Sequence, residues 1–143
     1  MKYRLFEWAF VCMALLSACS IETSDNGDLD GFWRLEQVDS VGRRAVADYS
    51  GQGIYWSFQH QLVQLSDQHG LSIIYRLAVA DGTLSLDHPY VFDRTDGDTP
   101  LTDVDVLRPF GVNALQEQFR IVTLDSEVMV LESSVLRLRF SRY

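Results

Sequence analysis

The 143-residue sequence predicts an all-β fold, an antiparallel up-and-down β-barrel of about eight strands with one or two short helical segments. Apolar and polar residues alternate with a period of two from Gly31 onward, which is typical of strands with one buried face. Turn-forming residues separate these segments at short intervals. A β-sandwich could hold the same strands, but closure into a barrel is favoured because it leaves no sheet edge exposed.

Two alternating segments open the domain, at residues 31–39 and 53–65. Their larger side chains fall on one face, which we expect to point into the barrel: Trp33, Leu35, Ile54, Trp56, Phe58, His60 and Leu62. The alternation changes phase at Leu62–Val63, which predicts a bulge or bend in the second segment.

Residues 71–80 and 83–87 form the next two alternating segments, and Tyr75 lies on the apolar face of the first. Asp81-Gly82 lies between them and predicts a tight hairpin, because both central positions of such a turn need a positive φ. A further short strand is expected at residues 90–92.

Two short helices are expected after these strands. Thr99 can cap the first helix, with Pro100 at its first position. Asn113, followed three residues later by Gln116, resembles a capping box that would begin the second helix.

Three strands complete the chain, at residues 119–124, 128–132 and 135–143. Asp125-Ser126 and Ser133-Ser134 are suited to the turns between them. Apolar residues alternate with arginines in the last strand, so we expect its apolar face to complete the core.

The N-terminus has the pattern of a secretory signal. Lys2 and Arg4 precede an apolar run at residues 6–16, which is too short to span a bilayer. The residues at 16–19 are Leu-Ser-Ala-Cys, and they resemble the lipobox of bacterial lipoproteins. The resemblance implies that Cys19 becomes the first mature residue and carries acyl chains such as palmitate, which form a durable membrane anchor.

The sequence therefore divides into three parts. Residues 1–18 are the predicted signal peptide, and residues 31–143 are the predicted barrel domain. Residues 19–30 contain the lipidated Cys19 and an acidic stretch without apolar periodicity, which predicts a flexible linker. The expected location is the bacterial cell envelope, at the outer membrane, facing the periplasm or the cell surface.

Composition excludes several classes of function. The formal net charge of −8 argues against nucleic-acid binding, which needs cations to neutralise phosphates. The two cysteines, Cys12 and Cys19, lie in the signal and at its cleavage site, so the mature domain has no disulfide, thiolate metal ligand or cysteine nucleophile. Lys2 is the only lysine, so the mature domain has no Schiff-base lysine and no P-loop lysine.

Gly31-Phe32-Trp33 resembles the Gly-x-Trp motif that opens lipocalins and related barrels. The stretches at 107–113 (LRPFGVN), 129–133 (MVLES) and 136–140 (LRLRF) are similar to small lipocalin-like bacterial lipoproteins, many of which have no assigned function. The resemblance covers about residues 28–143. It implies a calycin-type barrel whose interior can bind a small apolar molecule, without identifying that molecule.

The same resemblance implies that an arginine late in the barrel covers the tryptophan of the motif. Arg137 and Arg139 are the candidates to cover Trp33. Strand alternation places both on the face opposite Leu136 and Leu138, so a contact with Trp33 would require a bulge. The resulting cation–π contact would stabilise the fold and would not bind a ligand.

The predicted lining of a ligand site is the inward aromatic set with one polar contact: Trp33, Trp56, Phe58, Tyr75 and His60. An eight-stranded barrel is just wide enough to be filled by side chains or to hold one small ligand. One hypothesis is a membrane-anchored protein that binds a small apolar or amphipathic molecule in the barrel. The other is a non-catalytic structural or interaction lipoprotein whose packed barrel recognises an envelope protein or a glycan.

No catalytic residue, cofactor or metal site is predicted. The sequence lacks the Gly-x-Ser-x-Gly, phosphate-loop, dinucleotide-binding and His-Glu-x-x-His motifs. His60, His69 and His88 do not have metal-ligand spacing. The acidic stretch at residues 93–105 does not fit an EF-hand, so we expect a solvated loop there and a protein that is not an enzyme.

Overall fold

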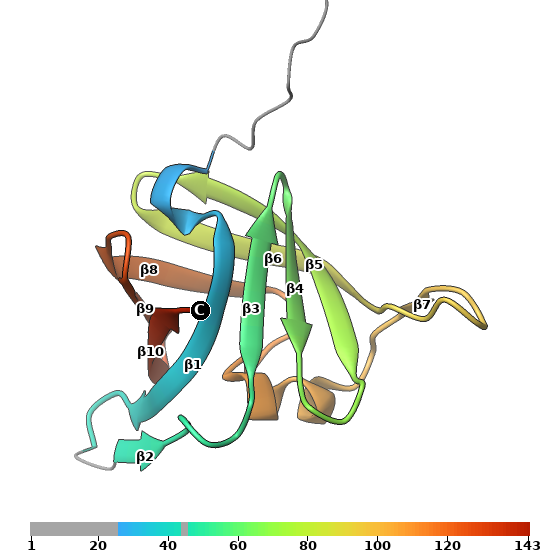
Figure 1. Ribbon diagram of the computed structural model, residues 1–143, viewed down its shortest axis with the longest axis horizontal. Coiled ribbons are helices and arrows are strands. Elements are labelled where there is room, and N and C mark those ends of the chain that lie inside the picture. Colours follow the sequence, from blue (N-terminus) through green and yellow to red (C-terminus); the bar gives the residue numbers. More distant parts are fainter. Residues whose placement is uncertain (1–25, 44–45) are drawn as a thin grey trace, which may run out of the picture.

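The computed structural model describes residues 26–43 and 46–143 and contains a closed antiparallel barrel of eight strands (Figure 1). Each barrel strand pairs with the next one along the chain, and the last pairs with the first, which confirms the up-and-down barrel predicted from the alternation. The barrel strands are β1 (Gly31–Ser40), β3 (Tyr55–Gln59), β4 (Leu62–Ser66), β5 (Ser72–Ala80), β6 (Thr83–Val91), β8 (Glu117–Leu124), β9 (Val128–Glu132) and β10 (Leu136–Arg142).

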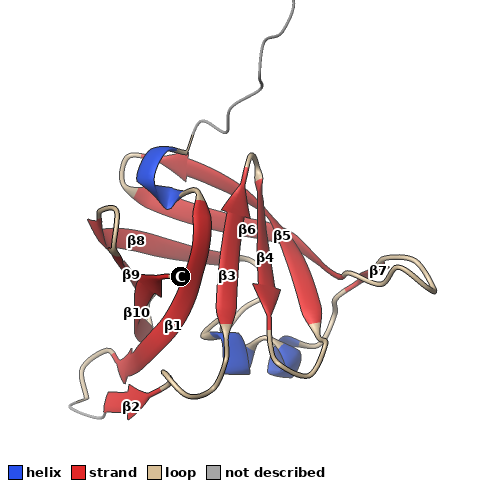
Figure 2. Ribbon diagram, viewed as in Figure 1, coloured by secondary structure: helices blue, strands red, loops and turns tan. Residues whose placement is uncertain are grey.

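Short elements lie beside and across the ends of this barrel. β2 (Val46–Asp48) pairs with β1, and β7 (Thr99–Pro100) pairs with β6. The 3₁₀ helix η1 (Gly27–Leu29) lies at one end of the barrel, and η2 (Val104–Val106) and η3 (Arg108–Phe110) lie at the opposite end (Figure 2).

The helices differ in position from those the sequence predicts. Residues 99–100 do not begin a helix, because they pair with β6 and form β7. Helix η2 begins later, where the Asp103 side chain accepts a hydrogen bond of 2.9 Å from the Asp105 backbone N–H. Asn113 does not begin a helix either: residues 114–116 form a bend that leads directly into β8, and the Asn113 backbone N–H donates to the carboxylate of Glu117, not to Gln116.

The segment at residues 53–65 forms a hairpin, so the prediction of a single strand with a bulge or bend at Leu62–Val63 is wrong. β3 ends at Gln59, a turn follows, and β4 returns with Leu62 opposite Gln59. His60 occupies the turn with a φ of 54° and is exposed. The apparent phase change at Leu62 is the reversal of the chain, and His60 therefore does not lie on the inward face as predicted.

The hairpin predicted at Asp81-Gly82 is confirmed. The two residues have φ values of 51° and 73°, the left-handed conformation that this type of turn requires. β6 then continues through Val91, so the short strand expected at residues 90–92 is the end of β6.

The core fills the inside of the barrel and extends into both ends. Its largest fully buried side chains include Trp33, Trp56, Phe58, Tyr75, Phe110, Phe119 and Phe140. Leu29 of η1 is 1% exposed at one end, and Leu107 and Phe110 are at most 1% exposed at the other. We call residues 26–30 and 107–114 the two closing segments.

The first closing segment changes the boundary of the predicted linker. The sequence predicts residues 26–30 to be the end of a flexible linker, but Leu29 belongs to the core and Asn26 bonds to Asp30 and to the His60 backbone oxygen. These residues are therefore part of the packed fold. The predicted signal peptide and Cys19 lie outside the described residues.

Candidate functional site

The aromatic side chains predicted to line a ligand site all lie inside the barrel and are at most 2% exposed: Trp33, Trp56, Phe58 and Tyr75. The ring of Trp56 lies 5.0 Å from that of Phe140, 5.6 Å from that of Phe119 and 6.2 Å from that of Phe58, measured between centroids. These tilted and edge-on contacts are the usual packing of aromatic cores. Side chains therefore fill the space around Trp56.

Two of these aromatics hold the closing segment at the η2–η3 end. The Trp56 Nε1–H donates to the Phe110 backbone oxygen over 3.1 Å, and the Tyr75 hydroxyl donates to the Ala114 backbone oxygen over 3.1 Å. Burial, together with the nearby charge of Glu117, raises the pKa of Tyr75 above its ordinary value. The Tyr75 hydroxyl therefore remains a hydrogen-bond donor to this segment at physiological pH.

Gly111 lets the same closing segment approach the barrel wall. It ends η3 with a φ of 85°, and a Cβ atom there would lie 2.8 Å from Leu138 Cδ2 in the core. A side chain at this position would meet both backbone strain and an overlap with a fully buried leucine.

Trp33 and Arg142 hold the opposite closing segment. The Trp33 Nε1–H donates to the Leu29 backbone oxygen over 2.9 Å. Arg142 lies with its guanidinium carbon 4.1 Å from the Trp33 ring centroid, and it donates to the backbone oxygens of Asp28 and Asp30. The arginine that covers the tryptophan thus also fastens η1 to the end of the barrel.

Arg142 replaces the predicted candidates Arg137 and Arg139. The pairing of β1 with β10 places Arg142 directly opposite Trp33. Arg142 also follows Phe140 by two positions, so the alternation along β10 puts it on the inward side at the barrel rim. Continuing that alternation to the end of the sequence would have identified it.

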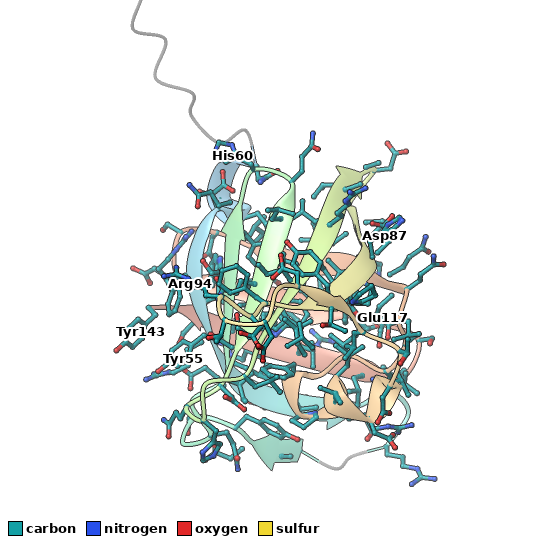
Figure 3. All side chains as sticks on the ribbon, turned by 90° about the vertical axis from the view of Figure 1, so that its right-hand side faces the viewer. Tyr55, His60, Asp87, Arg94, Glu117 and Tyr143 are labelled. Carbon is teal, nitrogen blue, oxygen red and sulfur yellow. The ribbon has the colours of Figure 1, made fainter. Side chains whose placement is uncertain are left out.

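His60, the polar contact predicted for the ligand site, does not join the inward aromatics. Figure 3 shows His60 at the top of the barrel, where it lies in the turn between β3 and β4. Among the described residues, no group of three histidine, cysteine or acidic side chains could hold a metal ion. In the acidic stretch, Asp93 accepts hydrogen bonds from the Thr95 and Asp96 backbone N–H groups, so this carboxylate stabilises its own turn.

An aromatic cluster on the outer wall was not predicted. Phe32, Tyr55 and Tyr143 lie with ring centroids 5.1–5.8 Å apart, and Tyr143 is 71% exposed. Tyr55 and Tyr143 lie on the side of the barrel opposite Asp87 and Glu117 in Figure 3. The sequence signal for this cluster is that Phe32 and Tyr55 each sit beside an inward tryptophan and so point outward.

Comparison with known proteins gives a family and a fold. A family model described as a lipocalin-like domain matches residues 14–143. A lipocalin-like protein from Bacteroides uniformis superposes with a TM-score of 0.63 at 16% identity, over 82% of this chain and 100% of that one. An uncharacterized protein from Bacteroides eggerthii gives 0.57 at 15% identity, over 80% and 98% of the two chains.

The structural matches establish the barrel fold, and no curated protein matches the sequence. Across the described ranges, the structure contains no helix long and apolar enough to cross a membrane.

Proposed function

The chain belongs to the lipocalin-like domain family, and from this premise we propose that it is a non-catalytic lipoprotein of the bacterial cell envelope. Acyl chains on Cys19 hold it at the outer membrane. Its packed barrel serves as a rigid support, and its outer wall recognises an envelope component.

The observation that carries this proposal is the use of the interior donors. Trp33, Trp56 and Tyr75 each donate their polar hydrogen to a backbone oxygen of a closing segment. A small apolar ligand in the barrel would have to displace these segments and leave buried polar groups without partners, which costs about 1–3 kcal/mol for each group. Recognition on the outer wall requires no such rearrangement.

The position of the anchor supports an orientation as well as a location. Six residues lie between position 19 and Asn26, the first described residue, so the two are seven residue steps apart and a fully extended chain spans about 25 Å at most between them. Asn26 immediately precedes η1 and therefore lies at the η1 end of the barrel. In the acylated protein, the η1 end therefore stays near the bilayer and the η2–η3 end points away from it.

The anchor is tested by labelling cells that express the full chain with radioactive palmitate. We expect label on the wild-type protein, and we expect globomycin to block its processing. Cys19→Ser should carry no label and should leave the membrane fraction. Equal labelling of the two proteins, or processing that globomycin does not affect, would contradict the proposed anchor.

The filled interior is tested by native mass spectrometry. The described core is contained within residues 29–140, so a soluble form that begins at residue 20 retains all of it. We expect this form, purified from an envelope extract, to have the mass of the polypeptide alone. A bound molecule that is released on denaturation, and whose binding is lost in Trp56→Phe, would favour a ligand in the barrel.

A further inference from the structure

The aromatic cluster of Phe32, Tyr55 and Tyr143 forms a continuous patch on the outer wall. The Phe32 ring stacks on that of Tyr55 with centroids 5.2 Å apart, and the Tyr143 ring lies edge-on to Tyr55 at 5.1 Å. The Tyr143 backbone N–H donates to the Phe32 backbone oxygen over 2.9 Å, which holds Tyr143 against β1. Phe32 is 39% exposed and Tyr143 71% exposed. The rings are therefore fixed to one another, and no described element covers them.

The polar groups around these rings suit a boundary between an apolar phase and water. Arg34 pairs with Tyr55 across β1 and β3, and its guanidinium bonds to the Glu36 carboxylate over 2.7 Å, so the two neighbouring charges offset each other. The hydroxyl groups of Tyr55 and Tyr143 make no hydrogen bond to any residue that the structure describes. Tyrosines are favoured at membrane interfaces because the ring is apolar while the hydroxyl stays wet.

The cluster lies close to the point where the chain enters the fold. The Asn26 side chain bonds to the Asp30 carboxylate over 2.8 Å, and Phe32 follows Asp30 by two residues, which is about 7 Å of chain at most. Asn26 itself is seven residue steps from Cys19, the proposed site of acylation. This short connection keeps the cluster close to the bilayer surface in the acylated protein.

The connection to Cys19 does not by itself decide which side of the barrel faces the bilayer. Figure 3 shows Tyr55 and Tyr143 on one side of the barrel and Asp87 on the other. The outer wall beside Asp87 also carries Arg120, which bonds to Glu132 over 3.2 Å. Turning this side toward lipid would remove water from charged groups, whereas turning the aromatic side toward lipid would bury apolar rings.

We infer that the cluster of Phe32, Tyr55 and Tyr143 is a docking surface for the headgroup region of the bilayer that holds the acyl chains. The rings enter the boundary between headgroups and acyl chains, and the barrel leans on its β1–β3 side near the η1 end. Zwitterionic lipid is the expected contact, because the formal net charge of −8 opposes approach to an anionic surface. The inference rests on the proposed function in taking Cys19 as the anchor, and it identifies the envelope component that the outer wall meets.

The test uses the acylated protein in phosphatidylcholine vesicles, with one fluorophore on an introduced cysteine. Cys12 lies in the predicted signal and Cys19 is acylated, so no other thiol competes for the label. Ser57→Cys places the label opposite Phe32.

Ser85→Cys is the matched control for Ser57→Cys. Both serines are half-buried, and each lies two residues from the last pair of a hairpin at the η1 end. They differ in the side of the barrel, because β6 lies three strands from β3.

A headgroup-linked spin-label quencher in the vesicles should quench the label at position 57 about threefold or more relative to the label at position 85. The reason is that a docked interfacial surface enters the bilayer by about 5–10 Å, which leaves the other side of the barrel in water. A barrel that only hangs on its tether turns freely, so both labels would then be quenched to the same extent.

Replacing both Phe32 and Tyr143 with alanine should remove the difference between the two labels, while the protein stays with the vesicles through its acyl chains. Val46→Ala combined with Val135→Ala is the control. These valines are 62% and 49% exposed at the opposite end of the barrel, and their loss should leave the difference unchanged. If the double aromatic variant does not fold, Tyr143→Ala alone replaces it and should reduce the difference.

The results that overturn the inference differ in what they imply for the proposed function. Equal quenching of the two labels in a protein that still takes up palmitate removes the docking surface and leaves the anchor standing. Absence of palmitate overturns the anchor and the docking surface together.

Other occupants of the cluster would also overturn the inference. A quenching difference that persists without Phe32 and Tyr143 would place the contact elsewhere on the barrel. Without lipid, a position-57 signal that changes with protein concentration would assign the cluster to a second copy of the chain. A signal that changes with soluble peptidoglycan fragments would assign it to a glycan.

Discussion

The inside and the outside of the barrel carry similar aromatic side chains but use them differently. Inside, Trp33 and Trp56 are fully buried, and each donates its indole hydrogen to a closing segment. Outside, the rings of Phe32, Tyr55 and Tyr143 contact one another, one pair stacked and two pairs tilted or edge-on, and they remain partly exposed. The comparison teaches that the interior aromatics hold the ends of the barrel closed, whereas the aromatic side chains that a partner could contact lie on the outer wall.

The largest expected effect comes from removing one aromatic from each side. Trp56→Ala should lower the free energy of unfolding by about 3–5 kcal/mol, because it leaves a cavity and frees the Phe110 oxygen. Phe32→Ala is the matched outer change and should cost about 1 kcal/mol or less. Urea unfolding measures both, and equal losses would show that the two sides do not differ in packing.

The next prediction concerns the contact of the closing segment with the wall. Gly111→Ala should destabilise the protein by about 1–3 kcal/mol, since the residue has a positive φ and the new Cβ would press on Leu138. Gly97→Ala is the control, because Gly97 has nearly the same φ of 84° and open space around it.

Thermal unfolding of the two glycine variants separates backbone strain from the overlap. We expect Gly111→Ala to melt at a clearly lower temperature than Gly97→Ala. If the two melt together, Leu138 does not pack against the closing segment in solution.

A smaller effect is expected from single hydroxyl groups. Tyr75→Phe should cost about 1 kcal/mol, because it removes the bond to the Ala114 oxygen and leaves that oxygen without its donor. Tyr55→Phe should be nearly neutral, since the hydroxyl of this outer tyrosine makes no hydrogen bond within the residues described. Chemical unfolding and hydrogen exchange at residues 112–117 check both, and protection of that segment in Tyr75→Phe would refute the role of the hydroxyl.

The smallest effect is a pH dependence on the outer wall. Burial alone would raise the pKa of Glu36, but hydrogen bonds from Ser141 and Arg34 and the charge of Arg34 outweigh it and lower the pKa below its ordinary value of 4.5. The ionised carboxylate therefore stabilises the fold above that value, and this contribution disappears as the pH falls through the lowered pKa.

Comparison of Glu36→Gln with wild type across this range measures that contribution. The difference in unfolding free energy should be present near neutral pH and should shrink on acidification. The exposed Glu127→Gln serves as the control and should show little difference at any pH. A difference for Glu36→Gln that grows on acidification would contradict the assigned hydrogen bonds.

Local pattern was enough to predict most of the barrel. Alternation places a residue on one face through its immediate neighbours, so it identified inward residues such as Trp33, Trp56 and Tyr75 and the hairpin at Asp81-Gly82. The same local rule failed at His60, because the chain reverses there: Gln59 pairs with Leu62 on the outer face, so the alternation that runs through Phe58 ends before the turn and resumes in the opposite phase at Val63.

The features that were missed depend on contacts distant in sequence. Arg142 covers Trp33 because β10 closes against β1, and no neighbour of either residue reveals that pairing. Leu29 is buried because η1 packs across one end of the barrel, where Trp33 bonds to the Leu29 backbone oxygen. The burial of Glu117 likewise depends on its pairing with Leu86 across the sheet, and the Asn113 backbone N–H donates to its carboxylate.

The central claim, that the barrel is filled and closed by its own side chains, is tested most directly by hydrogen exchange at the indole N–H groups of Trp33 and Trp56. Both donate to closing segments inside a fully buried core. We predict exchange as slow as that of the most protected backbone amides, which requires global unfolding. Rapid exchange of either indole in the folded protein would mean that an end of the barrel opens, and would contradict the account.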